Sequence, residues 1–216
     1  MARLAIFDID GTLIPGASSE VRFVHYLRRR RVLGVRQWLA YGWFFLRYAP
    51  RFRQHVTKKN KAWLTGLEKH RVHALAGEFV HTELQPILHA PTLKRLRAHQ
   101  AAGDVVVLLS GTPQFLAAAL AQALHAKASY GALCSIGGDD IFRAAPPTRH
   151  PYGASKVAGA EALAAAAGLP LATAVAYGDS VHDAYLFRRV GEAVAVQPDR
   201  GLQAVASGEG WEVMPD

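Results

Sequence analysis

Two carboxylates, Asp8 and Asp10, stand two residues apart directly after the short apolar run at residues 4–7. Such a run predicts a buried strand, and in an open α/β sheet ligands bind at the carboxyl ends of the strands. Burying two ionised groups there is costly unless a metal ion or a basic partner offsets the lost hydration. The pair therefore predicts metal-assisted nucleophilic or acid–base chemistry, with an ordinary Asp-Gly turn as the simpler alternative.

Further polar groups stand at the ends of later predicted elements. The β-branched run at residues 105–109 ends in Ser110, Gly111 and Thr112, whose hydroxyls and N–H groups predict a phosphate-binding turn or a plain helix cap. Lys156 opens an Ala-rich helix that is otherwise almost free of charge, where a surface position is the ordinary alternative.

Acidic residues follow the next apolar run, which ends in Gly178, Asp179 and Ser180. Asp179 predicts a metal ligand, and Asp183, four residues on, returns to the same site from the following helix. The alternative is that Asp179 or Ser180 caps that helix.

Apolar runs without polar alternation place these groups on a sheet. They cover residues 4–7, 105–109, 173–177 and 193–196, and helical patterns cover residues 92–101, 113–124 and 155–167. Continuous apolar strands alternating with helices predict a doubly wound parallel α/β sheet covered on both faces.

Residues 16–86 interrupt this alternation with helical spacing and no strand signal. Helices are expected from Ser18 or Ser19 to Leu27 and over residues 35–48, 52–64 and 67–84, with Pro50 separating the middle two. Val21, Val24 and Leu27 are expected in the core of this insertion. The prediction is an α/β core at residues 1–15 and 87–216 and an all-helical cap at residues 16–86.

Taken in order, residues 7–13, Ser110-Gly111-Thr112, Lys156 and Gly178-Asp179-Ser180 with Asp183 resemble the four motifs of the haloacid dehalogenase (HAD) superfamily. The helical insertion resembles the C1 cap of the phosphoserine-phosphatase-like branch, subfamily IB. The resemblance implies a Rossmann-like core and a phosphatase that forms an aspartyl phosphate.

The resemblance also implies a role for each motif residue. Asp8 is the nucleophile, Asp10 the acid and base, and Asp183 orients Lys156 or the water molecules on the metal. Mg²⁺ is held by Asp8, the backbone carbonyl of Asp10 and Asp179. The residues expected to bind phosphate or substrate are Gly11, Thr12, Glu20, Ser110, Gly111, Thr112, Lys156 and His182.

Two departures from the phosphoserine phosphatases bear on the substrate. Glu20 is the nearest candidate for the cap acid that reads the substrate amine in those enzymes, but its spacing from the first motif is longer. His182 stands where they carry Asn before the final Asp, and it either contacts phosphate or faces solvent. Phosphoserine is therefore disfavoured, and the cap shows no pattern that names another substrate.

Composition constrains the partners and the location. The net charge of +8 favours anionic partners. The single cysteine, Cys134, excludes an intramolecular disulfide, suits a buried structural role and fits a cytoplasmic location. The apolar run before Asp8 is too short for an export signal, and residues 38–46 are too few for a membrane span, which needs about 20 residues.

Arginines and aromatic residues alternate in the cap, beginning with the run Arg28-Arg29-Arg30-Arg31. The favoured interpretation packs the aromatic side chains inside and leaves the arginines outside. A cap that receives an anionic small substrate comes next, and nucleic-acid or peripheral membrane contact is the least favoured.

These observations together predict a Mg²⁺-dependent phosphomonoesterase acting on a small phosphorylated metabolite. A phosphotransferase or mutase acting on a sugar phosphate is the alternative within the enzymes. A protein that uses its basic cap to bind nucleic acid or anionic lipid is the alternative of another class.

Overall fold

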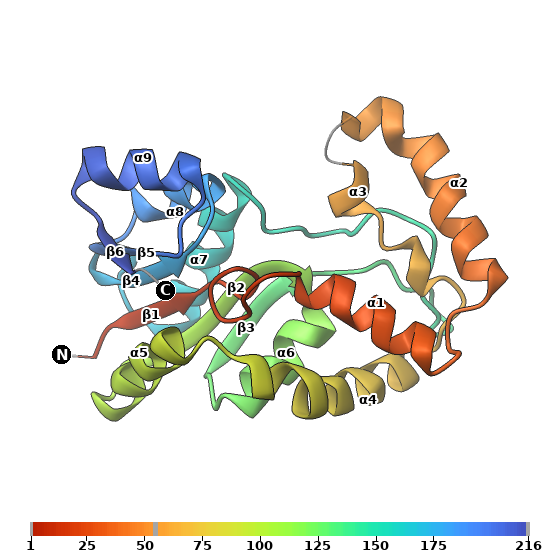
Figure 1. Ribbon diagram of the computed structural model, residues 1–216, viewed down its shortest axis with the longest axis horizontal. Coiled ribbons are helices and arrows are strands. Elements are labelled where there is room, and N and C mark those ends of the chain that lie inside the picture. Colours follow the sequence, from red (N-terminus) through yellow and green to blue (C-terminus); the bar gives the residue numbers. More distant parts are fainter. Residues whose placement is uncertain (1, 54–55, 215–216) are drawn as a thin grey trace.

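A six-stranded parallel sheet forms the centre of the protein in the computed structural model, which describes residues 2–53 and 56–214 (Figure 1). The strand order is β3-β2-β1-β4-β5-β6, and every neighbouring pair is parallel. The strands are β1 (Leu4–Phe7), β2 (Val105–Pro113), β3 (Ala128–Ala132), β4 (Val175–Gly178), β5 (Glu192–Val196) and β6 (Glu212–Met214). The predicted doubly wound parallel sheet is confirmed.

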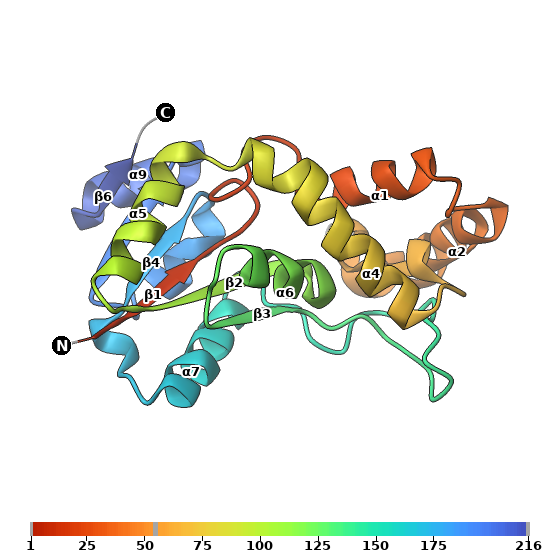
Figure 2. The same cartoon turned by 90° about the horizontal axis from the view of Figure 1, so that it is seen from below.

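Helices cover both faces of this sheet, as the uninterrupted apolar strands require. On β1, Ala5 and Phe7 join the core beneath α5 (Ala90–Ala101) and α6 (Gln114–Ala123). Leu4 and Ile6 point to the other face, because side chains alternate along a strand. That face carries α7 (Ser155–Ala167), α8 (Ala184–Phe187) and α9 (Arg200–Glu209). Figure 2 shows α5 and α7 on opposite sides of the sheet.

Several element boundaries differ from the sequence-based expectation. β3, β6 and α9 were not expected, because short runs such as Ala-Ser-Tyr-Gly-Ala in β3 lack a strong pattern. The helix expected after Ser180 is present as the 3-10 turn η6 (Val181–Asp183) followed by α8. The strand expected over residues 173–177 begins at Val175, because Leu171–Thr173 forms a 3-10 helix, η5.

The secondary-structure elements described between β1 and α5 are all helices, joined by turns and loops. It contains α1 (Ser19–Arg29), α2 (Val35–Phe52), α3 (Val56–Lys59), η2 (Ala62–Leu64), α4 (Lys69–Phe79), a π-helical turn η3 (Val80–Leu84) and η4 (Gln85–Ile87). The expected break at Pro50 is wrong, since Pro50 lies in the last turn of α2. The helix expected over residues 52–64 is replaced by α3 and η2, and its residues 54 and 55 lie outside the described residues.

The core of the helical segment holds fewer of its aromatic residues than expected. Phe23, Tyr26, Leu27 and Phe79 are buried and pack on Phe115 of α6 through Phe23. Val21, expected in this core, is instead 47% exposed. Trp38, Trp43 and Phe45 of α2 are exposed as well, so the interpretation that packs the aromatic side chains inside is wrong for these three, although Phe44 of α2 is buried.

A long segment between β3 and α7 crosses from the sheet to the helical segment and back (Figure 1). Its residue Phe142 exchanges backbone hydrogen bonds with Leu67 and Gly66 at 3.0 Å each, and the N–H of Lys69 donates to Asp140 at 2.9 Å. Phe142 is also fully buried against Phe115. Asp140 and Phe142, which the sequence assigns to the α/β core at residues 87–216, therefore pack on the helical segment.

Candidate active site

The predicted catalytic groups meet at the carboxyl ends of β1, β2 and β4. β1 places Asp8, β2 carries Ser110 and Thr112, and β4 is followed by Asp179. They line a cavity of about 350 Å³, which we call the first cavity. Its other predicted lining residues are Asp10, Glu20, Gly111, Lys156, His182 and Asp183.

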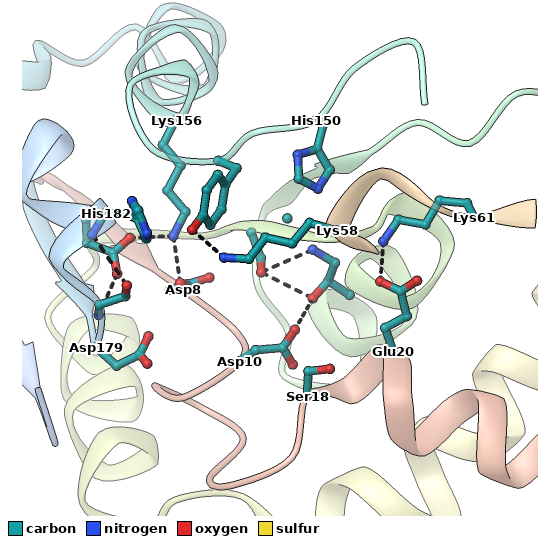
Figure 3. A pocket seen from close by; sticks show the side chains of 16 residues that line it. Asp8, Asp10, Ser18, Glu20, Lys58, Lys61, His150, Lys156, Asp179 and His182 are labelled. Carbon is teal, nitrogen blue, oxygen red and sulfur yellow. Dashed lines mark hydrogen bonds and ion pairs between the residues drawn. The ribbon is translucent and has the colours of Figure 1, made fainter. Parts of the chain in front are cut away.

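Lys156 joins two carboxylates at the base of the first cavity (Figure 3). Its Nζ donates to Asp8 Oδ2 at 2.6 Å and to Asp183 Oδ1 at 2.5 Å, and its side chain is 6% exposed. The first turn of α7 thus supplies a buried cation rather than a surface lysine. Burial alone would lower the pKa of Lys156, but Asp183 and Asp8 outweigh it and raise that pKa, so the ammonium stays charged.

Asp8, Asp179 and Asp183 each place a carboxylate oxygen within 4.8 Å of the others. We call them the carboxylate cluster. Burial and the neighbouring negative charges raise the pKa of Asp179 to about 8, and burial is the main cause that raises the pKa of Asp8 to about 6. Three acids facing one ammonium leave an excess of negative charge, which is the environment that a divalent cation neutralises.

Gly11 is what allows Asp179 to approach β1. Its φ of +84° favours glycine, and a Cβ at this position would lie 2.0 Å from Asp179 Oδ2. Gly11 itself does not line the first cavity. Thr12 does not line it either. The side chain of Thr12 is fully buried, and its hydroxyl has no hydrogen-bond partner within the described residues.

The carboxylate of Asp10 is held separately from the carboxylate cluster. Its Oδ2 accepts a hydrogen bond from Thr112 Oγ1 at 2.8 Å, and its Oδ1 accepts one from the N–H of Ser19 at 2.6 Å. Ser19 begins α1, so the first helix after β1 helps to orient this group toward the cavity (Figure 3). Ser110 lies next to Thr112, with its Oγ 3.2 Å from Thr112 Oγ1.

Glu20 lies at the opposite side of the first cavity from Lys156 (Figure 3). Its carboxylate pairs with the ammonium of Lys61, whose side chain is 3% exposed, and accepts a hydrogen bond from Trp63 Nε1 at 3.0 Å. Glu20 therefore reaches the cavity with a buried cation and an indole as partners. Lys61 was not expected at the site, because nothing in a basic stretch marks one lysine as buried.

His182 lines the first cavity together with residues that the sequence did not single out. Its ring stacks obliquely on Tyr152 with the centroids 4.5 Å apart. Lys58 of α3 hydrogen-bonds to the Tyr152 hydroxyl, and His150 also lines the cavity. Tyr152 and His150 arrive on the segment that crosses to the helices, so no spacing from the motifs could place them.

A second cavity of about 410 Å³ adjoins the first and shares Ser18, Glu20 and Lys58 with it. Its walls come from α1 and α2 and from the residues around η2, with largely apolar side chains. They include Val21, Val24, Trp38, Tyr41 and Trp63. The first cavity is therefore polar and anionic at the sheet, and space beyond it is lined by aromatic and aliphatic groups.

The doubly wound parallel sheet and the polar groups at its carboxyl edge are typical of an enzyme with a Rossmann-like α/β core. The family model of the haloacid dehalogenase-like hydrolases matches residues 5–188, and the chain belongs to this family. The prediction of an enzyme of the HAD superfamily is confirmed.

Similar curated proteins agree with that assignment. A probable phosphatase of Mycobacterium tuberculosis is 30% identical over 97% of this chain and 74% of its own length. Phosphoserine phosphatase SerB1 of the same organism is 29% identical over 97% of this chain and 69% of its own. Histidinol-phosphatase of Neisseria meningitidis is 28% identical over 99% of both chains.

Solved structures share the fold. A protein of unknown function from Bordetella pertussis superposes with a TM-score of 0.79 at 24% identity, over 99% of both chains. A phosphoserine phosphatase with an analogue of its phospho-aspartyl intermediate superposes with a TM-score of 0.62 at 16% identity, over 99% of this chain and 93% of that one. These superpositions show that the chain shares the fold of these proteins, a phosphoserine phosphatase among them.

Proposed function

We propose that this protein is a Mg²⁺-dependent phosphomonoesterase that forms an aspartyl phosphate on Asp8. The observation that carries the proposal is the placement of Asp8 in the carboxylate cluster, in contact with Lys156 and at the wall of a cavity. A buried acid with excess negative charge around it needs a cation in its working state. The names of the similar phosphatases support the same reaction class.

The carboxylate cluster fits a magnesium ion by the chemistry of its donors. Asp8, Asp179 and Asp183 offer oxygen ligands, which Mg²⁺ prefers together with water. When bound, the ion neutralises the repulsion between an anionic carboxylate and an anionic phosphate. We propose Asp8, Asp179 and the backbone carbonyl of Asp10 as its ligands, with Asp183 beside them as a further ligand or as the partner that fixes Lys156.

In the proposed reaction, Asp8 attacks phosphorus and the ester oxygen leaves with the bonding electrons. Asp10 donates a proton to that oxygen, so the product leaves as an alcohol. Asp10, now a carboxylate, accepts a proton from the water that attacks phosphorus and releases inorganic phosphate, which restores Asp8. The hydrogen bonds from Thr112 and from the N–H of Ser19 keep Asp10 oriented through both steps.

Ser110, Gly111 and Lys156 are proposed to hold the phosphoryl oxygens. Ser110 is 3% exposed and Lys156 carries a buried positive charge, so both are fixed before substrate arrives. Preorganised donors of this kind stabilise the charge that develops on the transferred group. Gly11 and Thr12 are left with a different proposed role, which is to shape the turn that brings Asp179 to β1.

We propose a small phosphorylated metabolite as the substrate, with its alcohol portion directed toward the cap at residues 16–86. Glu20 already has Lys61 and Trp63 as partners, so an amine of the substrate would have to compete with a buried ammonium. Phosphoserine remains disfavoured on this ground. Phosphoserine and histidinol phosphate, which the names of two relatives suggest, both belong in a substrate screen.

The proposed location is the cytoplasm, because the single cysteine forms no internal disulfide. Cys134 is half-buried, and burial raises the pKa of its thiol to about 12, which keeps it protonated and unreactive. None of the described helices is long and apolar enough to cross a membrane.

Phosphate release from an aryl phosphate tests the proposed function. Purified protein should release phosphate with Mg²⁺, lose that activity with a chelator, and lose it in the Asp8→Asn variant. Asp140→Asn is the matched control, since Asp140 is exposed and does not line the first cavity. Full activity in Asp8→Asn would overturn the proposal, and phosphate recovered on an added sugar instead of in solution would favour a phosphotransferase.

A further inference from the structure

The outward face of α2 is apolar although it lies in solvent. Val35, Leu39, Trp43 and Leu46 are 75%, 69%, 63% and 72% exposed, and their spacing puts them on one side of the helix. The opposite side carries the buried residues of α2, which include Phe44. The helix is therefore anchored by one apolar face and presents a second one to its surroundings.

Arginines border this outward face, and α2 contains no acidic residue. At 100° per residue, Arg36 and Arg47 lie along one edge of the apolar face, and Trp38 and Phe45 lie along the other. We call the apolar face with these two edges the α2 surface. Figure 1 shows α2 at the end of the molecule remote from β5 and β6.

The stretch of sequence that contains α2 carries charge of one sign. Residues 21–67 contain no Asp or Glu, and they hold 12 of the 25 lysines and arginines of the chain. Arg29 and Arg30 are paired with Glu83 and Glu78 of the neighbouring helices, but Arg36, Arg47 and Arg51 lie in a stretch without acids. An occupant of the α2 surface must accept apolar side chains and bring negative charge.

We propose that the α2 surface binds an anionic lipid bilayer, with α2 lying in the plane of the interface. Amphipathic helices that combine arginine with tryptophan, leucine and phenylalanine bury the apolar face at the boundary of headgroups and acyl chains. The arginine edge adds attraction to anionic headgroups. A span is excluded for α2, which is about 27 Å long by its helical rise and carries arginines.

A second copy of the chain is a poorer occupant. A symmetric contact through the α2 surface would bring together two stretches that each hold 12 basic residues and no acid. Like charges at that distance repel, whereas an anionic bilayer attracts both the helix and the rest of the basic stretch. The charge pattern therefore selects the bilayer over self-association.

Bilayer binding through α2 would bring the second cavity to the lipid. Trp38 and Tyr41 of α2 line that cavity, which opens toward the first cavity at Glu20. An amphiphilic phosphate at the bilayer surface is thus the class of ligand that this arrangement would receive. The binding itself needs no catalysis, so it stands apart from the proposed function.

Vesicle sedimentation tests the proposal. The protein is mixed with vesicles of phosphatidylcholine alone or of equal amounts of phosphatidylcholine and phosphatidylglycerol, and the bound fraction is measured with rising salt. Binding is expected to the anionic vesicles and to weaken with salt. Arg36→Gln/Arg47→Gln should lower the partition coefficient by about 5-fold for each arginine removed.

Leu39→Glu/Leu46→Glu removes the apolar contact and should lower the partition coefficient on the order of 100-fold. Lys94→Gln/Arg200→Gln lowers the net charge by the same two units on exposed positions of α5 and α9, and should bind almost as the unaltered protein does. Phosphate release from a soluble aryl phosphate should be unchanged in all three variants, which shows that each is folded.

Three results would overturn the proposal. The first is that the protein does not bind anionic vesicles. The second is that Leu39→Glu/Leu46→Glu binds them as well as the unaltered protein does. The third is that sedimentation velocity shows a dimer, which this variant abolishes, while the protein does not bind vesicles. Asp8→Asn should bind vesicles as the unaltered protein does, so failure of the catalytic proposal and failure of this one are distinguishable.

Discussion

Two groups of polar side chains are buried on this sheet, and their charges are balanced differently. At the carboxyl ends of the strands, Asp8, Asp179 and Asp183 face the single ammonium of Lys156. Beneath α5, at the amino end of β2, Asp104 accepts hydrogen bonds from the N–H of Arg3 at 3.0 Å and from His99 Nδ1 at 2.7 Å.

The second group, which we call the α5 network, is closed by Tyr177, whose hydroxyl lies 2.8 Å from His99 Nε2. Although burial acts to raise it, the pKa of Asp104 is lowered, because His99 and Arg3 hydrogen-bond to the carboxylate and attract it. In the carboxylate cluster the pKa of Asp179 moves the other way, to about 8.

This difference in charge balance distinguishes a network that stabilises the fold from a cluster that binds ligands. In the α5 network each charge has a partner within the chain, so the network favours the folded state by itself. In the carboxylate cluster the partners are incomplete until a cation and a phosphate arrive. The folded protein therefore carries an electrostatic cost at the site where it binds its ligands.

Removing Lys156 should have the largest effect, because it takes away the ammonium that contacts both Asp8 and Asp183, where negative charge is already in excess. We expect Lys156→Met to lower kcat/KM by about 10³-fold or more in a phosphate-release assay with Mg²⁺. Lys94→Met, an exposed lysine on α5, is the control and should keep normal activity. A Lys156→Met enzyme within 10-fold, about 1.4 kcal/mol, of the unaltered one would contradict this role.

Asp179→Asn should remove one negative charge from the carboxylate cluster. The remaining charges are then closer to balance, as they are in the α5 network. The metal-free variant at pH 8 should then melt higher than the unaltered protein, by about 3 °C if the gain is about 1 kcal/mol. The rise in melting temperature on adding Mg²⁺ should disappear. Differential scanning fluorimetry measures both, and a metal-free variant that melts lower would break the comparison.

Breaking the α5 network should lower stability without touching the chemistry. His99→Ala removes one hydrogen-bond partner of Asp104, which keeps Arg3, and the partner of the Tyr177 hydroxyl, at a cost of about 2–3 kcal/mol in urea unfolding. His70→Ala, at a side chain 80% exposed, should change the free energy of unfolding little. Both should keep kcat/KM at a temperature where they are folded, and a loss of activity in His99→Ala would mean that the two groups are coupled.

The stability of the metal-free protein should change gradually with pH. Asp179 has a folded-state pKa of about 8, above its ordinary value of 3.8, so the folded state holds a proton that the unfolded state releases. Its contribution is complete below pH about 4 and is lost as pH rises toward 8. Urea melts across this range should show the decline, and saturating Mg²⁺ should reduce it.

Much of the candidate site was predictable from the sequence because its residues end consecutive parallel strands. Strand ends mark the carboxyl edge of the sheet, so Asp8, Ser110 and Asp179 could be placed together without coordinates. Lys156 could be placed only through the resemblance, since a lone lysine at the start of a helix carries no signal of burial.

The cap was less predictable, for a physical reason. The pattern of apolar residues tells which faces of a helix avoid water, and α2 has two such faces on opposite sides. The sequence pattern of such a helix resembles that of a fully buried helix, although one of its faces is exposed to solvent. Tyr152 and His150 were also beyond reach, because they are set by the path of a long connection and not by periodicity.

The crossing segment between β3 and α7 has a consequence for how far the first cavity can open. The helical segment is continuous with the sheet at both of its ends, and through Asp140 and Phe142 it is hydrogen-bonded at a third place. Any swing that widens the first cavity must break those hydrogen bonds or carry the segment, with His150 and Tyr152, along with it. Any opening of the first cavity is therefore tied to the movement of the crossing segment. The length of that segment limits how far the helical segment can move away from the sheet.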